Sequence, residues 1–255
     1  MKLAYREFGQ GQPLIILHGL FGQSDNWNTI AKKFSENGFH VFTLDLRNHG
    51  LSPHSDIWNY EVMADDLKEF IDYHNLENPT LLGHSMGGKT VMFFELKYSG
   101  IASKIIIADI SPRAYEPHHG DVLEALNAVD FKTIKTRKEA EATLNNCLSD
   151  FGTKQFLLKN IYWRDSENNL MDWRFNLKII TKNIDAMSIA LPKGKSNVRT
   201  LVIRGEKSNY VNENDLEDFT KHFPNHQVET ILGAGHWIHA EKPKEFFDAV
   251  MNFIQ

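Results

Sequence analysis

A serine flanked by glycines is the residue best suited to covalent chemistry in this sequence. Residues 83–87 (GHSMG) match the pattern Gly-x-Ser-x-Gly, follow a short apolar run at 80–82 and precede a helix-like run at 88–98. At such a strand-to-helix turn the backbone is strained, the serine hydroxyl is exposed, and larger side chains in place of the glycines would clash. The order of strand, motif and helix predicts that Ser85 is a nucleophile. Lys89, in the same segment, is interpreted as a solvated surface residue.

A histidine near the C-terminus could supply the base that this serine needs. Serine is a weak nucleophile at neutral pH, so a histidine must remove its proton and later return it to the leaving group. Among twelve histidines, His236 alone combines a preceding strand-like run at 228–232, flanking glycines and a following helical stretch. The chain order of serine first and histidine last also fits a nucleophile at a strand-to-helix turn. We therefore predict that His236 is the general base.

Short apolar runs alternate along the chain with amphipathic stretches of helical length, and these elements must position the two residues. This rhythm predicts an α/β fold with a mostly parallel sheet flanked by helices. Helices are expected at about 24–34 and 60–73, with an antiparallel edge pair before residue 14. The expected buried strands are residues 14–17, 41–44, 80–82, 104–108 and 200–203.

Residues 111–195 depart from this rhythm. They contain no strand-like run, and their aromatic residues recur in helical patterns. Ligand sites gather at the C-terminal ends of parallel strands. We therefore predict a helical cap at 111–195, inserted before the penultimate core strand, over a core formed by residues 1–110 and 196–255. The alternative is that these helices only extend the core.

Composition narrows the classes of partner. The chain has 255 residues, 24% charged residues and a net charge of -5, so one folded domain is expected and no broad cationic surface is available for nucleic acid. A single cysteine, Cys147, cannot form an intramolecular disulfide and is interpreted as a small buried residue. The charged N-terminus lacks a signal-peptide pattern, and no apolar run reaches membrane-spanning length. We expect a cytoplasmic monomer or small homo-oligomer with no nucleic-acid or membrane partner.

Five segments, spread over nearly the whole chain, share their patterns with one enzyme superfamily. They are residues 18–22 (HGLFG), 45–52 (DLRNHGLS), 83–89 (GHSMGGK), 109–112 (DISP) and 233–237 (GAGHW). Together they resemble the α/β-hydrolase superfamily, and within it small bacterial carboxylesterases and acyl-CoA thioesterases. The resemblance implies an α/β-hydrolase fold and hydrolysis of short to medium acyl esters through an acyl-enzyme on Ser85, with acyl-CoA thioesters as related substrates. It implies no metal or organic cofactor.

The same resemblance assigns an oxyanion hole. The strand at 14–17 leads into the segment 18–22, where this architecture supplies a second backbone donor. We assign the two donors to the backbone N–H groups of Leu20 and Met86. Such donors stabilise the negative oxygen of a tetrahedral intermediate by roughly 3 to 4 kcal/mol each. His18 is expected to hydrogen-bond the loop.

A polar turn follows the strand at 41–44. Residues 45–52 look like the superfamily's Asp-x-Arg-Gly-His-Gly-x-Ser turn, with Asn48 in place of a glycine. Asparagine tolerates the left-handed backbone that glycine would adopt. We interpret Asp45, Arg47 and His49 as a hydrogen-bonded scaffold beneath the site.

The carboxylate of the triad departs from the superfamily's usual position. In most relatives it follows the strand at 200–204, but Ser208 occupies that place here. Asp109 follows the core strand at 104–108, at the same catalytic edge of the sheet. We choose it as the acid of the triad ahead of Glu206 and Asp215. Its alternative role is to cap the turn into the residues that follow it.

Aromatic side chains are candidates for the substrate pocket. Phe21, Trp163, Trp173 and Trp237 could line an apolar acyl pocket, although aromatic residues in helical segments are more often part of a core. The adjacent His118 and His119 could suggest a metal site. Neighbouring side chains point apart, however, and no matching carboxylate or cysteine spacing accompanies them, so no metal is predicted.

Two other interpretations of the same site stay open. The triad could hydrolyse another bond, as in carbon-carbon bond hydrolysis, lactone opening or perhydrolysis, because a fold does not fix a reaction. Alternatively, the protein could bind a small ligand without turning it over, an interpretation motivated by the serine at position 208.

Overall fold

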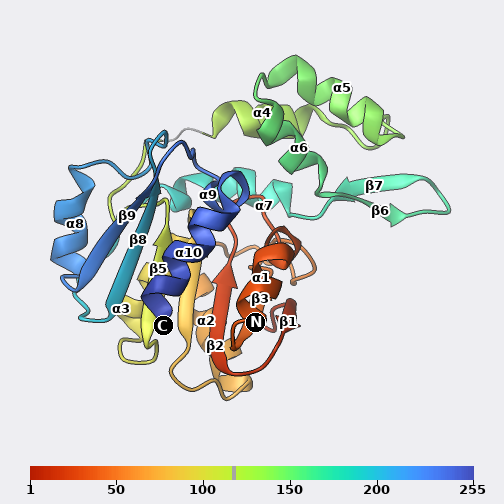
Figure 1. Ribbon diagram of the computed structural model, residues 1–255. Coiled ribbons are helices and arrows are strands. Elements are labelled where there is room, and N and C mark those ends of the chain that lie inside the picture. The colour runs from red at the N-terminus through yellow and green to blue at the C-terminus, as the bar shows by residue number, and fades with distance from the viewer. Residues whose placement is uncertain (117–118) are drawn as a thin grey trace.

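A twisted seven-stranded sheet forms the core of the computed structural model, which describes residues 1–116 and 119–255 (Figure 1). The strand order is β1-β3-β2-β4-β5-β8-β9; β1 pairs antiparallel with β3, and the other pairs are parallel. The predicted α/β class is thereby confirmed, whereas the segment before residue 14 supplies one antiparallel edge strand, which pairs with β3 and not within that segment. The core strands are β1 (Tyr5–Phe8), β2 (Gln12–Leu17), β3 (Phe39–Leu44), β4 (Thr80–His84), β5 (Lys104–Ala108), β8 (Arg199–Gly205) and β9 (His226–Ile231).

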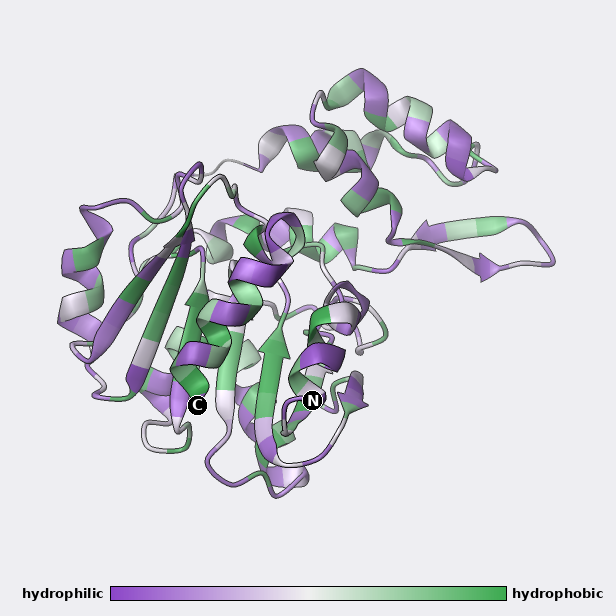
Figure 2. Cartoon of the chain, viewed as in Figure 1, coloured by the Kyte–Doolittle hydropathy of each residue, from purple (hydrophilic) through white to green (hydrophobic). Residues whose placement is uncertain are grey.

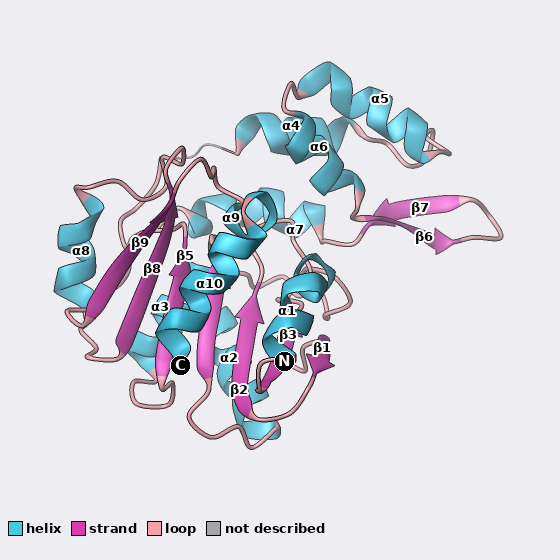
Figure 3. Cartoon of the chain, viewed as in Figure 1, coloured by secondary structure: helices cyan, strands magenta, loops and turns pink. Residues whose placement is uncertain are grey.

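The central strands are apolar on both sides because helices cover both faces of the sheet (Figures 2 and 3). Along β2, Leu14 and Ile16 pack in one hydrophobic cluster, whereas Ile15 and Leu17 pack in the other. The first cluster includes residues of α1 (Asn28–Ser35) and α10 (Pro243–Ile254). The second includes residues of α2 (Tyr60–Tyr73), α3 (Met86–Lys97) and α8 (Asp215–His222). The short elements η1 (Ser24–Trp27) and α9 (Ile238–Glu241) complete the core.

The segment between β5 and β8 lies beyond the C-terminal ends of the core strands, where their arrowheads point (Figure 1). Its helices are α4 (Gly120–Ala128), α5 (Arg137–Cys147), α6 (Phe151–Leu158), α7 (Leu177–Asn183) and η2 (Ile184–Met187). This is the place expected of a cap. The exact division into cap and core stays a prediction.

The expectation that residues 111–195 contain no strand is wrong. An antiparallel hairpin, β6 (Ile161–Asp165) with β7 (Leu170–Trp173), projects from the cap. Tyr162 and Trp163 favour extended backbone, and Asn169 adopts a positive φ of 50° just before β7. The aromatic residues interpreted as helical therefore belong partly to a hairpin.

Cys147 is exposed at the end of α5, so its interpretation as a buried residue is wrong. The register of α5 explains this, because Ala140 and Leu144 form its buried stripe. Within the described ranges, no helix has both the length and the apolar character needed to cross a membrane.

Candidate active site

The turn that carries Ser85 has the strained geometry predicted for a nucleophile. Ser85 has a φ of 52° between β4 and α3, and its N–H donates to the carbonyl oxygen of Ala108 at 2.9 Å. A Cβ atom on Gly83 would lie 2.3 Å from the backbone of Gly87, and one on Gly87 would lie 2.4 Å from the carbonyl oxygen of Leu17. The two glycines are thus required by close backbone contacts, which hold Ser85 at the end of the sheet.

The structure brings His236 and Asp109 together. His236 Nδ1 lies 2.8 Å from Asp109 Oδ2, and the aspartate is fully buried. Because a carboxylate can only accept at this contact, the neutral imidazole carries its proton on Nδ1, which leaves Nε2 able to take a proton. Asp109 does not cap its own turn; its other oxygen accepts the N–H of Gly205 at 3.2 Å.

Ser208 was not recognised from the sequence as part of this network. Its hydroxyl donates to Asp109 Oδ2 and accepts the N–H of Tyr210 at 3.2 Å. The serine at the superfamily's usual acid position thus contacts the aspartate on the neighbouring strand. The pairing of β5 with β8 creates this contact, so no local sequence signal could have revealed it.

The two other carboxylates considered for this role have different partners. Glu206 accepts the N–H of Gly233 at 2.8 Å. Asp215 forms a buried ion pair with Arg113 Nε at 2.8 Å. Among the described carboxylates, Asp109 is the one that contacts His236.

Two aromatic neighbours fix the loop that carries His236. The ring of Tyr210 stacks on His236 with centroids 3.8 Å apart and planes 16° apart. His84 Nε2 lies 2.8 Å from the carbonyl oxygen of His236. Burial holds the pKa of His84 well below its usual range, so this ring is neutral and donates its Nε2 proton to that carbonyl.

Neutral histidines also hold the loop after β2. His18 Nε2 accepts the N–H of Leu46 at 3.0 Å, and His49 Nε2 accepts the N–H of Phe21 at 3.3 Å. Burial lowers the pKa of His18 to about 4 and that of His49 to about 3. Phe21 has a positive φ of 59°, and the contact with His49 stabilises this strained backbone next to Leu20.

The polar turn after β3 forms the expected scaffold. Arg47 binds both carboxylate oxygens of Asp66, at 2.6 and 2.8 Å, in a buried pair. Asp45 accepts the N–H of Ser24 at 2.6 Å, which ties this turn to the start of η1. Asn48 has the expected positive φ, 66°.

A hollow of about 20 Å³ lies above Ser85. Leu20 and Met86 line it, as expected for the residues assigned to the oxyanion hole, and the donor role of their N–H groups stays a prediction. The other walls include Tyr60, Tyr115, Met187 and Tyr210, which the sequence did not single out. The space holds about one water molecule.

None of the four aromatic residues proposed for the substrate pocket lines the small hollow above Ser85, and their role in binding substrate stays a prediction. Phe21 packs on Phe175 with ring centroids 5.0 Å apart, and Trp173 is buried and stacks on the same ring at 5.4 Å. Trp237 contacts Phe156 of α6, and Trp163 is 46% exposed on the hairpin. Packing between cap and core explains the positions of Phe21 and Trp237, whereas Trp173 packs inside the cap.

Lys89 is fully buried, so its interpretation as a solvated residue is wrong. Its ammonium group donates to the carbonyl oxygens of Ser111 at 2.8 Å and Arg113 at 2.7 Å. Burial lowers the pKa of Lys89 to about 7. The side chain therefore ties the helix after Ser85 to the chain segment after Asp109.

No group of three or more histidine, cysteine or acidic side chains that could hold a metal ion is found within residues 1–116 and 119–255. His118, which was considered with His119, lies outside the described residues.

Comparison with known proteins agrees with this architecture. The family model of the alpha/beta hydrolase fold matches residues 12–150 and 153–243. The chain belongs to this family.

Its relatives narrow the class further. The chain is 35% identical over 243 residues to Esterase YbfF of Escherichia coli, covering 95% of this chain and 92% of the relative. It is also 35% identical over 249 residues to a mouse protein named sn-1-specific diacylglycerol lipase ABHD11, covering 94% and 80% of the two chains. A solved structure of a marine microorganism esterase matches with a TM-score of 0.95 and 40% identity over 99% of both chains. The protein is therefore a hydrolase of the α/β-hydrolase superfamily that resembles bacterial esterases.

Proposed function

We propose that the protein is a carboxylesterase that forms an acyl-enzyme on Ser85. The observation that carries this proposal is the contact between His236 Nδ1 and the buried Asp109, at 2.8 Å, at the end of the sheet where the strained turn presents Ser85. The esterase and lipase relatives support the same reaction class. The contact of Asp109 with His236, despite the serine at position 208, supports turnover over a purely ligand-binding role.

In the proposed acylation, His236 Nε2 takes the proton of Ser85 as the hydroxyl oxygen attacks the ester carbonyl. The carbonyl oxygen becomes an oxyanion that accepts hydrogen bonds from the N–H groups of Leu20 and Met86. Asp109 stabilises the positive imidazolium that forms. Collapse of the intermediate breaks the ester bond, and the proton leaves with the alcohol.

Deacylation repeats these steps with water. His236 removes a proton from the water molecule, whose oxygen attacks the acyl carbon, and the same proton then returns to Ser85 as the acid departs. Because the hollow above Ser85 holds about one water molecule, any acyl group needs side chains such as Met187 to move, and we expect a preference for short acyl groups because they need the smallest movement. An acyl-CoA thioester would undergo the same two steps with a thiol as leaving group.

A substrate panel tests this proposal. Purified protein is assayed with p-nitrophenyl esters of two to sixteen carbons and with acyl-CoAs, and Ser85→Ala serves as the blank. We expect the highest kcat/KM for short esters and no turnover above the blank in the variant. Turnover of a lactone or carbon-carbon substrate without any ester turnover would overturn the proposal, as would equal rates in the blank.

A further inference from the structure

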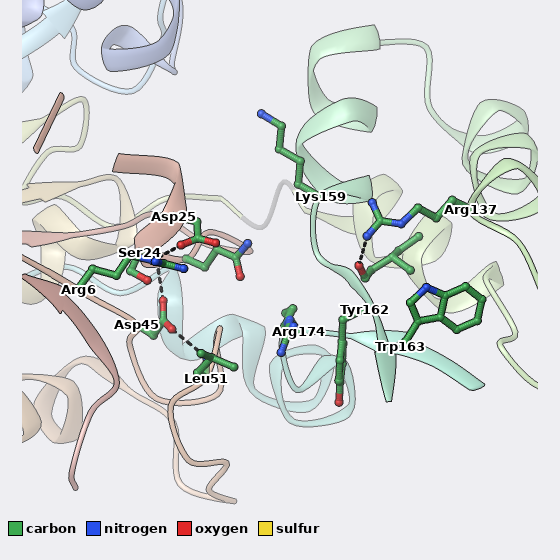
Figure 4. Close-up of a pocket in the computed structure, with 12 residues that line it drawn as sticks. Arg6, Ser24, Asp25, Asp45, Leu51, Arg137, Lys159, Tyr162, Trp163 and Arg174 are labelled. Atoms are coloured by element: carbon green, nitrogen blue, oxygen red, sulfur yellow. Dashed lines mark hydrogen bonds and ion pairs between the residues drawn. The ribbon is translucent and has the colours of Figure 1, made fainter. Parts of the chain in front are cut away.

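A second and larger cleft is lined by residues of both the cap and the core (Figure 4). Its volume is about 440 Å³, within the roughly 300 to 1,000 Å³ typical of small-molecule sites. We call it the cap cleft and define it by its charged residues. These are Arg6, Asp25 and Asp45 of the core and Arg137, Lys159 and Arg174 of the cap.

The acidic groups of the cap cleft already have partners. Arg6 forms an ion pair with Asp25. The carboxylate of Asp45 accepts the N–H groups of Ser24 at 2.6 Å and Leu51 at 2.8 Å and is buried. Asp25 is thus paired with Arg6, and even with the charge of Asp45 counted, the four cations of the cleft outnumber its two carboxylates.

The three cap cations have no carboxylate partner among the residues that the structure describes. Arg137 uses one nitrogen, Nη2, to donate to the carbonyl oxygen of Ile161 at 2.7 Å, which leaves its other N–H groups for a ligand. Arg174 lies over the ring of Tyr162, with the guanidinium carbon 4.2 Å from the ring centroid. Lys159 is exposed directly after α6. The cleft thus carries an excess of positive charge with one arginine held in place by an aromatic face.

We infer that the cap cleft binds a phosphate group. Guanidinium forks match phosphate oxygens in pairs, and a lysine adds a compact positive charge. Tyr162 and the half-exposed Trp163 also line the cleft, where the parts of their rings that Arg174 leaves uncovered would pack against the organic part of a phosphorylated molecule. A phosphorylated organic molecule would use both the cations and the aromatic side chains of the cleft.

The phosphate could arrive on the leaving group of a substrate or as a separate molecule. Gln23 lines the cap cleft and follows Leu20, which lines the hollow above Ser85, by three residues. Three residues of chain span at most about 11 Å, so a leaving group with an extended arm, such as the thiol end of coenzyme A, has a suitable length to bridge the two sites. This substrate role rests on the proposed function, whereas binding of the phosphate does not.

Calorimetric titration with inorganic pyrophosphate at low ionic strength tests the binding site. We expect saturable binding by the wild type and about tenfold weaker binding by Lys159→Ala, because one charge-assisted contact is lost. Lys178→Ala is the matched control, since Lys178 is an exposed cap lysine outside the cleft. No saturable binding by the wild type, or the same loss in the control, would overturn the inference.

Kinetics distinguish the two sources of phosphate. If the phosphate belongs to the substrate, the KM for acetyl-CoA relative to that for p-nitrophenyl acetate rises about tenfold in Lys159→Ala and stays constant in Lys178→Ala. If this ratio is unchanged while pyrophosphate binding is weakened, the site takes a separate phosphate. Binding remains measurable in Ser85→Ala, so failure of the esterase proposal and failure of this site are told apart.

Discussion

Replacing Asp109 with asparagine tests the acid of the triad with almost no change in side-chain volume. The aspartate accepts hydrogen bonds from His236 Nδ1, the Ser208 hydroxyl and the N–H of Gly205. Asparagine has one acceptor oxygen in place of two. If its amide group faces His236, the imidazole must carry its proton on Nε2, and that nitrogen can no longer accept the proton of Ser85.

The expected loss follows from the wrong tautomer and from the missing negative charge beside the imidazolium. The same change in a well-studied serine-protease triad lowers kcat by about 10⁴, which corresponds to about 5.4 kcal/mol of barrier. We expect a loss of this order for Asp109→Asn, because Asp109 is fully buried and solvent cannot replace its charge. The assay is kcat on p-nitrophenyl acetate.

Asp215→Asn is the matched control for this experiment. Asp215 is also a buried aspartate, but it pairs with Arg113 instead of His236. We expect kcat to fall less than tenfold in this variant, and thermal unfolding confirms that both variants are folded. If Asp109→Asn kept kcat within tenfold of the wild type, Asp109 would not be the acid.

Three further substitutions have distinct expected outcomes. Ser208→Ala removes one hydrogen bond to the Asp109 carboxylate; urea unfolding should show a loss of about 1.5 to 3 kcal/mol, and an unchanged stability would contradict the contact. Because the pKa of Lys89 is lowered in the folded state, the unfolded chain binds one more proton than the folded chain between about pH 7 and 10.5. As the pH rises through this range, the free energy of unfolding of the wild type should increase by up to about 1.4 kcal/mol per pH unit relative to Lys89→Met. Parallel curves of stability against pH would refute this. The lowered pKa of His49 affects stability at acid pH. Below about pH 6.5 this ring binds a proton in the unfolded chain, whereas in the folded chain it stays neutral down to about pH 3. The wild type should therefore lose stability more steeply than His49→Gln between pH 7 and 5 in thermal unfolding, and equal slopes would count against a neutral buried ring.

The parts of the site that the sequence predicts are those defined by short local patterns. The glycines around Ser85 form a short local pattern, although only Gly83 is required by a contact within the turn, with Gly87, whereas Gly87 is required by the carbonyl oxygen of Leu17 on β2. Helix α2 begins at the predicted Tyr60 because Asn59 accepts the N–H of Val62. The order of the strands along the chain also predicts that the loop of His236 follows the last strand, at the edge of the sheet where Ser85 lies.

The parts that could not be predicted depend on contacts between distant segments. The buried ammonium of Lys89 is satisfied by two backbone carbonyls more than twenty residues away, and such acceptors leave no mark on side-chain patterns. The hydroxyl of Ser208 reaches Asp109 only because their two strands pair. Trp163 lies on a hairpin because tertiary context and a four-residue turn override the helical interpretation of its neighbours.

The central claim is that Ser85 forms the covalent intermediate, and active-site labelling tests it most directly. The wild type is incubated with a fluorophosphonate, and the adduct is located by mass spectrometry of the digested protein. We predict one adduct on Ser85, and none in Ser85→Ala. An unlabelled Ser85 in a preparation that hydrolyses esters, or an adduct on another residue, would contradict the account.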